Sequence, residues 1–345
     1  MREVLLGVFD GYMPLERNKL TSETKIGGSP TYRPSLSESQ LMTIREWTTC
    51  GVCGRHMFLV LQAFSPLPQS SAGHHRMIYV FCCNSDACSR QPSSSWCAFT
   101  LQAENMDEEA LDDIQSEEAA RSDPVMASEL PPSTFPPCYV AIDSEPRKEI
   151  VVPTDLEAEM IRAAQENAKN PDITENDIKE LEQTIDLKDK PADYEFDKFR
   201  RRVAREPSQV IRYYERFPTE SCGVTLVSAV APPLFMRPSR VKEIIRIPPC
   251  RDCGAALIHE LQIMPTSVYY LRVRDYIASG SPSGDEGVDW GTVTVFVCSK
   301  DCSKDRSGSS LRKEFVFVEK APEQQDELEN LDGRVDLRTF MTGRT

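Results

Sequence analysis

The sequence predicts an α+β protein made of two related antiparallel β modules in a pseudo-symmetric arrangement, with a helical segment between them. One phrase occurs twice: CGVCGRHMFLVLQ at 50–62 and CRDCGAALIHELQ at 250–262 share both cysteines, the glycine, the leucine and the glutamine at the same offsets. Each copy leads into runs rich in β-branched and aromatic residues, which favour strands. Between the copies, the pattern changes to one typical of helices.

Residues 1–103 are predicted to form the N-terminal module. Val4–Val8 indicates a short buried strand, and it precedes the loop KIGGSP, in which Gly27 and Gly28 permit tight backbone geometry. Loops of Pro, Ser and Gly separate the later apolar runs, so we expect their strands to pair antiparallel. These runs lie at 57–64, 76–83 and 94–102.

Residues 104–150 are predicted to be a linker, first acidic and then proline-rich, and largely disordered. The stretch 101–123 holds nine acidic residues and one arginine with almost no aliphatic periodicity, a composition typical of disorder. Within the proline-rich part, CYVAI at 138–142 could instead pair as an edge strand. The acidic tail, 321–345, is expected to fray.

Residues 151–217 are predicted to be a helical connector. Thr154 with Glu157 three residues later forms a capping-box pattern, and 174–186 is a second helical segment. The basic stretch 198–216, divided by Pro207, is expected to supply two more helices. We expect its basic residues to face outwards, although a dedicated binding patch is the alternative. The apolar positions expected to pack on the core are Phe199, Val203, Val210, Ile211 and Tyr214.

Residues 218–320 are predicted to form the C-terminal module. A loop rich in Gly, Ser and Asp at 279–289 divides its apolar runs, as a Pro- and Ser-rich loop does in the first module. We therefore expect the two modules to share one fold. The apolar runs lie at 257–265, 267–277, 289–298 and 313–319.

Paired cysteines predict a metal site in each module. In the turn C-x2-C-G, two thiolates lie on one loop, and the glycine permits the backbone to direct both sulfurs inwards. A second pair follows a strand in each module, and four thiolates are the ligand set of a structural zinc ion. We therefore expect two structural Zn2+ ions, which makes both units zinc-knuckle modules. The expected ligands are Cys50, Cys53, Cys83 (or Cys82 in its place) and Cys88, and then Cys250, Cys253, Cys298 and Cys302, whereas Cys97, Cys138 and Cys222 are interpreted as ordinary buried or free cysteines.

The composition argues against several classes of function. The 345 residues carry a net charge of −14, which argues against general nucleic-acid binding because a phosphate backbone rewards Lys and Arg. No apolar run is long enough to span a membrane, and the N-terminus does not fit a secretory signal. We expect a location in the cytoplasm, and also in the nucleus, where thiols stay reduced and favour metal binding. No nucleophile-elbow, nucleotide-binding or metalloprotease motif occurs, so we expect no enzyme activity.

An ordered series of motifs runs through most of the chain. It comprises VLLGVFD, KIGGSP, CGVCG with LQAFSP, and HRMIYVFCCNSDAC, and later FDKFRRRVAREPSQVIRYY, IPPCRDCGAALIHELQIMP, DWGTVTVFVC and EFVFVE. This series resembles the programmed cell death protein 2 family, whose fungal members are named for small-subunit rRNA accumulation. Some members carry a MYND-type finger between the halves. This chain has an acidic stretch and the lone Cys138 there, so it resembles the "like" branch more closely, and MYND peptide recognition is not implied.

The resemblance implies a function that the residues alone do not identify. The family is associated with chaperoning the small-subunit ribosomal protein uS5, which would be the client here. The negative charge is compatible with this role, because complementary charge speeds the capture of a basic protein. We expect a monomer without a direct nucleic-acid or membrane partner. A regulatory adaptor in chromatin or cell-death signalling is the alternative, and direct RNA binding through 198–216 is a third.

Two kinds of client-binding element remain open at the level of sequence. An extended client segment could pair with an exposed sheet edge. Alternatively, the acidic stretch 101–123 could clamp a basic tail.

Overall fold

The computed structural model divides the chain into two compact units. One unit comprises 1–145 with 208–321, and the other comprises 146–207 with 322–345. The structure describes residues 4–20, 23–32, 36–67, 75–103, 122–146, 194–216, 231–277, 281, 283–302 and 309–321.

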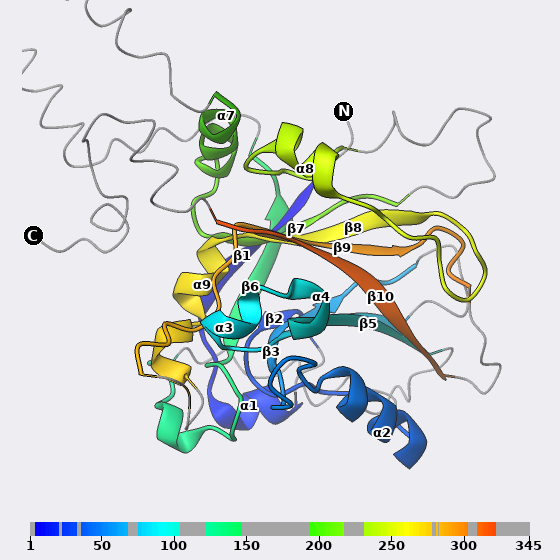
Figure 1. The fold of residues 1–345 in the computed structure, drawn as a ribbon. Coiled ribbons are helices and arrows are strands. Elements are labelled where there is room, and N and C mark those ends of the chain that lie inside the picture. The colour runs from blue at the N-terminus through cyan, green and yellow to red at the C-terminus, as the bar shows by residue number, and fades with distance from the viewer. Residues whose placement is uncertain are drawn as a thin grey trace, which may run out of the picture. The chain divides into compact units, whose positions relative to one another are not determined.

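The described strands of the first unit close into one barrel in which neighbours run antiparallel (Figure 1). Their order is β1-β6-β2-β3-β4-β5-β10-β9-β8-β7, and β7 pairs with β1 to close the ring. The strands are β1 Leu5–Tyr12, β2 Lys25–Ile26, β3 Phe58–Phe64, β4 His75–Cys82, β5 Trp96–Ala103, β6 Cys138–Ser144, β7 Gln209–Tyr213, β8 Leu257–Ile263, β9 Thr292–Cys298 and β10 Ser309–Glu319.

The helices are short. α2 begins with a capping box, in which Ser37 and Gln40 each satisfy a backbone amide of the first turn. Among the described residues, no helix has the length and apolar character needed to cross a membrane. The first unit contains α1 Leu15–Leu20, α2 Glu38–Trp47, α3 Asp86–Ser89, α4 Pro92–Ser95, η4 Ala127–Glu129, α8 Pro238–Ile244, α9 Thr266–Tyr270 and η6 Val273–Tyr276, and the second contains α7 Tyr194–Val203.

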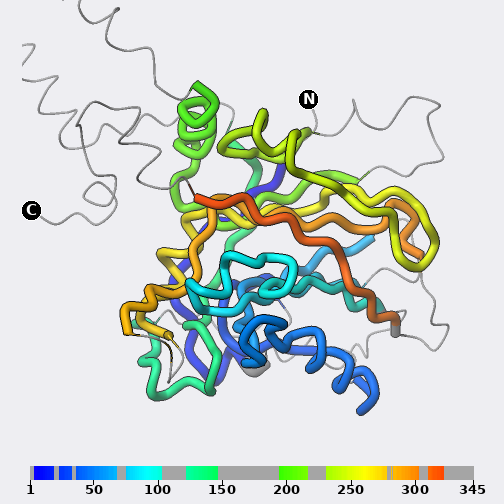
Figure 2. Tube along the Cα trace, in the orientation of Figure 1, coloured from blue at the N-terminus to red at the C-terminus, as the bar shows by residue number. Residues whose placement is uncertain are grey.

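The two halves of the chain contribute equivalent sets of strands to the barrel. β3–β5 and β8–β10 are each a three-stranded meander, and β5 pairs with β10, so the sets join edge to edge (Figure 2). Their registers agree as well. Leu61 pairs with Val80 directly after a bulge, and Leu261 pairs with Val295 after a bulge at the same offset from the repeated cysteines.

The expected α+β class is confirmed in its coarse form, since antiparallel β structure predominates and a few short helices accompany it. The expectation of two separate β modules is not met, because both sets belong to one closed barrel. Sheet closure explains this difference. A three-stranded sheet leaves unpaired N–H and C=O groups along both edges, and joining the edges satisfies them and encloses one shared interior.

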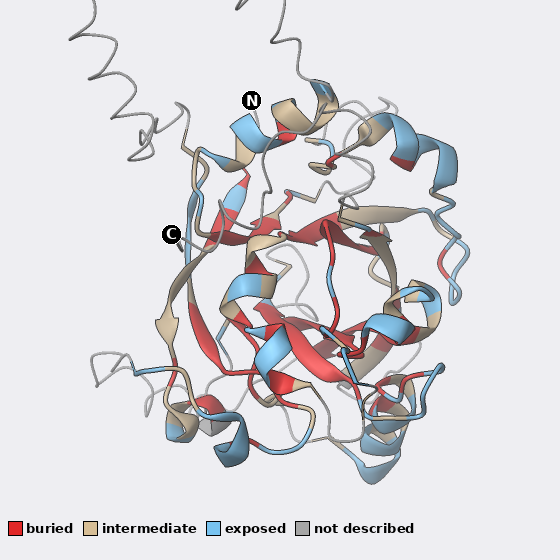
Figure 3. Cartoon of the chain, turned by 60° about the vertical axis from the view of Figure 1, so that its left-hand side comes forward, coloured by how far each residue is buried: buried red, intermediate tan, exposed pale blue. Residues whose placement is uncertain are grey.

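The barrel interior forms the main hydrophobic core. Leu61 and Leu261, the leucines of the repeated phrase, both lie in it and are fully buried. Trp96 of β5 and Trp290 meet edge to face inside it, with ring centroids 5.2 Å apart. Figure 3 shows the buried strands surrounding this interior. A second apolar cluster covers the outer face of β3–β5, where the Trp47 ring of α2 lies 6.0 Å from that of Phe99.

Three expectations about local structure require correction. Residues 122–146 are not part of a linker, because β6 pairs with both β1 and β2, as the alternative interpretation of CYVAI allowed. Residues 209–213 form β7 and not a helix, because Val210 and Ile211 are β-branched and find partner strands on both sides, β1 and β8. The aromatic run 267–277 forms the short helices α9 and η6.

Other expectations on the connector have mixed outcomes. Val210, Ile211 and Tyr214 are buried, and Phe199 is the buried residue of α7. Val203 is half-buried. The helices expected at 153–167 and 174–186, the acidic stretch 104–121 and the tail 322–345 lie outside the described residues.

Candidate metal centres

The eight cysteines expected as metal ligands come together in two groups. In each group, four Sγ atoms lie within 4.8 Å of one another. The Sγ atoms of Cys53 and Cys83 are 3.6 Å apart, as are those of Cys253 and Cys298. A tetrahedral zinc ion with Zn–S bonds of about 2.3 Å separates its sulfurs by about 3.8 Å. A disulfide needs about 2.05 Å, so the spacing fits a shared metal ion.

The repeated phrase folds into the same turn at both centres. In each copy, the amide of the first cysteine donates to the carbonyl five residues later at 2.8 Å. Gly54 and Gly254 both have φ of 72°. No atom lies within 4 Å of the position that a Cβ would take on either residue. Glycine is therefore required by the left-handed backbone and not by lack of space.

The second pair of thiols in each centre begins at the end of a strand. Cys298 is the last residue of β9, and the matched hairpin registers place Cys83, just after β4, at the equivalent position. Cys82 points into the barrel opposite Phe58 and belongs to the interior core. The structure thus brings Cys83 and not Cys82 into the thiol group. Cys97 and Cys138 are buried outside both groups, and Cys222 lies outside the described residues.

One thiol in each centre, Cys53 or Cys253, has a lowered pKa. Burial raises the pKa of Cys53, but hydrogen bonds from Arg55 and from neighbouring thiols outweigh burial and lower the pKa to about 6. A backbone hydrogen bond lowers the pKa of Cys253 to about 7. Burial, together with neighbouring thiols, raises the pKa of Cys83 and of Cys302. A bound dication would supply the positive charge that the remaining thiolates need.

The first centre is held in place by the second half of the chain. Asn84, which lies between Cys83 and Cys88 in the sequence, is 1% exposed. Its Nδ2 donates to the carbonyls of Val273 at 2.8 Å and Tyr276 at 3.2 Å. Its Oδ1 accepts from the amide of Val288 at 2.9 Å. The connection between β8 and β9 therefore anchors the loop that carries Cys83 and Cys88.

Two further contacts strengthen this anchor. The Asp285 carboxylate accepts hydrogen bonds from the Ser85 hydroxyl at 2.8 Å and from the Asp86 amide, at the start of α3, at 2.9 Å. The Arg55 guanidinium donates to the Ser281 hydroxyl at 2.8 Å. Both turns of the first centre are thus tied to residues of the second half.

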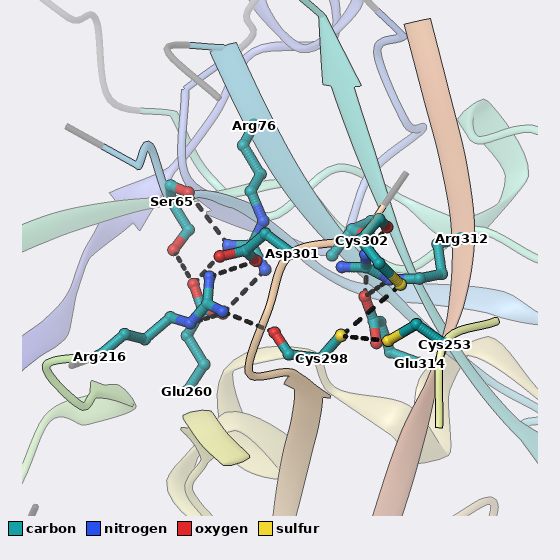
Figure 4. Close-up of polar contacts among 11 residues, drawn as sticks. Ser65, Arg76, Arg216, Cys253, Glu260, Cys298, Asp301, Cys302, Arg312 and Glu314 are labelled. Atoms are coloured by element: carbon teal, nitrogen blue, oxygen red, sulfur yellow. Dashed lines mark hydrogen bonds and ion pairs between the residues drawn. The ribbon is translucent and has the colours of Figure 1, made fainter. Parts of the chain in front are cut away.

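The second centre rests on a buried network of charges (Figure 4). Arg216 donates to the carbonyl of Cys298 at 2.7 Å and forms ion pairs with Asp301 at 2.6 Å and Glu260 at 3.5 Å. Arg76 of β4 forms a bidentate pair with Glu260, in which Nη2 lies 2.8 Å from Oε2. The side chains of Arg76 and Glu260 are 0% and 3% exposed. The network therefore connects the second centre to a strand of the first half.

Arg312 supports the second centre from β10. It donates to the carbonyl of Cys302 and pairs with Glu314 at 2.8 Å. The hydroxyl of Thr100 on β5 donates to the same carboxylate at 2.8 Å. The second half therefore bonds the first centre directly, whereas the first half is linked to the second centre through Arg76 on Glu260 and Thr100 on Glu314. Sequence reasoning missed these partners because no motif marks them.

The repeated glutamine also has a structural role that sequence analysis did not assign. Gln62 accepts from the amide of Thr31 at 2.9 Å and donates to the carbonyl of Glu23 at 3.0 Å. Gln262 bonds the amide and the carbonyl of Leu234 at 2.9 and 3.0 Å. Both glutamines are fully buried. Gln62 thus holds the chain near Glu23 and Thr31 against β3, and Gln262 holds the chain at Leu234 against β8. The recurrence of the glutamine in the repeat was the sequence signal that could have revealed this structural role.

Comparison with known proteins gives matches in both halves. Residues 3–112 match the family model of the N-terminal domain of programmed cell death protein 2, and residues 193–320 match that of its C-terminal domain. Programmed cell death protein 2-like of Homo sapiens is 23% identical, over 94% of this chain and 98% of its own length. Programmed cell death protein 2 of Mus musculus is 25% identical, over 85% of this chain and 90% of its own length. No solved structure matches significantly.

The two family models cover both repeated phrases and all eight of the grouped cysteines. The relatives align along nearly their whole length, so the likeness is not confined to one motif. The chain belongs to the programmed cell death protein 2 family.

Proposed function

We propose that this chain is a zinc-stabilised, non-enzymatic binding protein that chaperones the basic ribosomal protein uS5 and supports assembly of the small ribosomal subunit. The observation that carries the zinc part is the completeness of both thiol groups. Four thiolates fill a tetrahedral ion and leave no open position for substrate, so each Zn2+ stabilises the fold and performs no chemistry. The ligands are Cys50, Cys53, Cys83 and Cys88 at one centre, and Cys250, Cys253, Cys298 and Cys302 at the other.

The choice of client is supported by family resemblance and by charge. The net charge of −14 suits a basic protein partner and disfavours direct nucleic-acid binding. We propose that the chain acts as a monomer in the cytoplasm, and also in the nucleus, and shields its client until the client joins the ribosome. The alternative is a zinc-containing regulatory adaptor in chromatin or cell-death signalling.

Purification of the tagged full chain with its endogenous partners tests this proposal. We expect uS5 in near-equal amount, without mature ribosomes. Chromatin factors in its place would favour the adaptor. Tight RNA binding with a steep salt dependence would contradict both. As a control, a Cys253→Ser variant should lose the client, because its barrel would lack one metal centre.

A further inference from the structure

The two copies of the repeated phrase differ at the residue that follows the glycine. This residue is Arg55 in the first copy and Ala255 in the second. In both copies, its backbone bonds to the second cysteine of the turn, Cys53 or Cys253. Only the arginine adds a side chain that can donate a hydrogen bond. The two centres therefore share one turn but give the matched cysteines different surroundings.

The Arg55 guanidinium contacts the sulfur of Cys53. Its Nε donates to Cys53 Sγ at 3.5 Å, and its Nη1 donates to the Ser281 hydroxyl at 2.8 Å. The bond to Ser281 holds the side chain in place beside the thiol. A cation that donates to a thiolate stabilises the negative charge on sulfur, and a more stable thiolate is a weaker nucleophile. Arg55 should therefore protect Cys53 from attack by oxidants.

The arginines of the second centre bond to different atoms. Arg216 donates to the carbonyl of Cys298, and Arg312 donates to the carbonyl of Cys302. Both bonds hold the backbone of the cysteines, and neither is directed at a sulfur. These arginines therefore position the second centre without giving its sulfurs the protection that Arg55 gives Cys53.

The second centre is also the more accessible of the two. Cys53 and Cys253 are both exposed. The last cysteine of each group differs, because Cys88 is 2% exposed whereas Cys302 is half-buried. A small oxidant can therefore approach the second centre more easily than the first.

We infer that Cys253 is a site of oxidation by hydroperoxides, and that this oxidation releases zinc from the second centre while the first centre keeps its ion. The inference rests on the zinc part of the proposed function and does not depend on the client. Ligand thiols of a zinc ion are deprotonated, so differences in their reactivity come from access and nucleophilicity. Both favour Cys253 over Cys53.

The reaction joins two thiolates of the second centre. With hydrogen peroxide, the Cys253 sulfur attacks one oxygen, breaks the O–O bond and becomes a sulfenic acid, while the other oxygen leaves as water. The Sγ atom of Cys298, 3.6 Å away, then displaces the hydroxyl group as water and forms a disulfide (Figure 4). Two electrons pass from sulfur to the peroxide, and solvent supplies two protons. The centre keeps only two thiolates, too few to hold its ion.

Hydrogen peroxide added to the full, zinc-loaded chain tests the order of oxidation. A zinc-sensitive dye should report a fast release of about one ion per chain. The other ion should leave at least about tenfold more slowly, the factor expected from one hydrogen bond to a charged group. After the fast phase, alkylation and mass mapping should find the Cys253–Cys298 disulfide. A single release rate for both ions, or a disulfide within the first centre after the fast phase, would overturn the inference.

Exchange of the matched residues provides a second test. Arg55→Ala should speed the slow phase about tenfold, and Ala255→Arg should slow the fast phase. The second variant adds protection, so a loss of folding cannot imitate its effect. Ser281→Ala is the control for the first, since it removes one bond of Arg55 but keeps the guanidinium near Cys53, and it should change the slow phase less than Arg55→Ala. A slow phase that is the same in wild type and Arg55→Ala would overturn the inference.

Failure of the zinc proposal has a different signature. If elemental analysis finds no zinc in the wild-type chain, that proposal is wrong. The order of oxidation still tests Cys253, because mass mapping needs no metal and can be done at a pH above the pKa values of both exposed thiols. Oxidation of Cys253 before Cys53 would then support the site, and oxidation of Cys53 first, or of both at one rate, would overturn it.

Discussion

Asn84→Ala tests whether the second half of the chain holds the first metal centre. The wild-type side chain is 1% exposed and makes three hydrogen bonds, to Val273, Tyr276 and Val288. At a net value of about 1 kcal/mol per bond, the substitution should lower the free energy of unfolding by about 3 kcal/mol. The loss would be larger if no water molecule replaces the lost hydrogen bonds, because each buried carbonyl or amide without a hydrogen-bond partner destabilises the fold by about 1–3 kcal/mol.

Urea unfolding of the full chain with excess zinc measures this loss. Thr43→Ala is the control, since it removes one exposed hydrogen bond on α2 and should lower the free energy of unfolding by less than about 0.5 kcal/mol. Cobalt(II) binding, followed by its thiolate absorption, measures the effect on the centres themselves. We expect Asn84→Ala to weaken the first centre, whose loop the residue anchors, and to leave the second unchanged. A destabilisation below about 1 kcal/mol, or equal weakening of both centres, would refute the reasoning.

Three other predictions follow from the metal centres and the barrel. Elemental analysis should find two zinc ions per wild-type chain and one in Cys253→Ser, and an unchanged metal content would show that the ligand assignment is wrong. Gly54→Ala and Gly254→Ala should each lower the free energy of unfolding in urea by about 1–2 kcal/mol, because the strain lies only in the left-handed backbone and no atom blocks the new methyl group. A much larger decrease at either residue would contradict that explanation. Burial lowers the pKa of Lys25 to about 7, so between pH 7 and pH 10 the unfolded chain holds a proton that the folded chain lacks. The stability of the wild type should therefore rise with pH relative to Lys25→Met, by at most about 1.4 kcal/mol per pH unit, and a difference that stays flat over this range would contradict the shift.

Local turn chemistry made the two cysteine groups predictable from the sequence. The C-x2-C-G turn is specified by neighbouring residues, since Gly54 and Gly254 supply the left-handed backbone and the first cysteine closes the turn onto the carbonyl five residues later. The recurrence of this turn, with a second cysteine pair after a strand, was enough to group all eight cysteines. Only the choice between Cys82 and Cys83 needed the structure, because it depends on which residue of β4 faces the barrel interior.

Strand partners were the part that sequence patterns could not predict. CYVAI at 138–142 and SQVIRYY at 208–214 contain β-branched and aromatic residues that favour strands, but both segments are short and lie beside proline, basic residues or helical patterns that obscure this preference. They became strands because the barrel required β6 and β7 to close it beside β1. Tertiary pairing therefore agreed with the strand preference of both segments and supplied the partners that the sequence could not name.

The sequence by itself determined the two thiol centres, the antiparallel character of both halves and the family. Only the tertiary structure decided that the halves join through β5 and β10, that the second half anchors the first centre, and that Arg76 of the first half pairs with Glu260 in the network beside the second centre. The physical reason is the distance along the chain between the residues that interact. A turn is set by bonds among about six residues, whereas Asn84 with Val273 and Arg76 with Glu260 meet only after the whole ring of strands has closed.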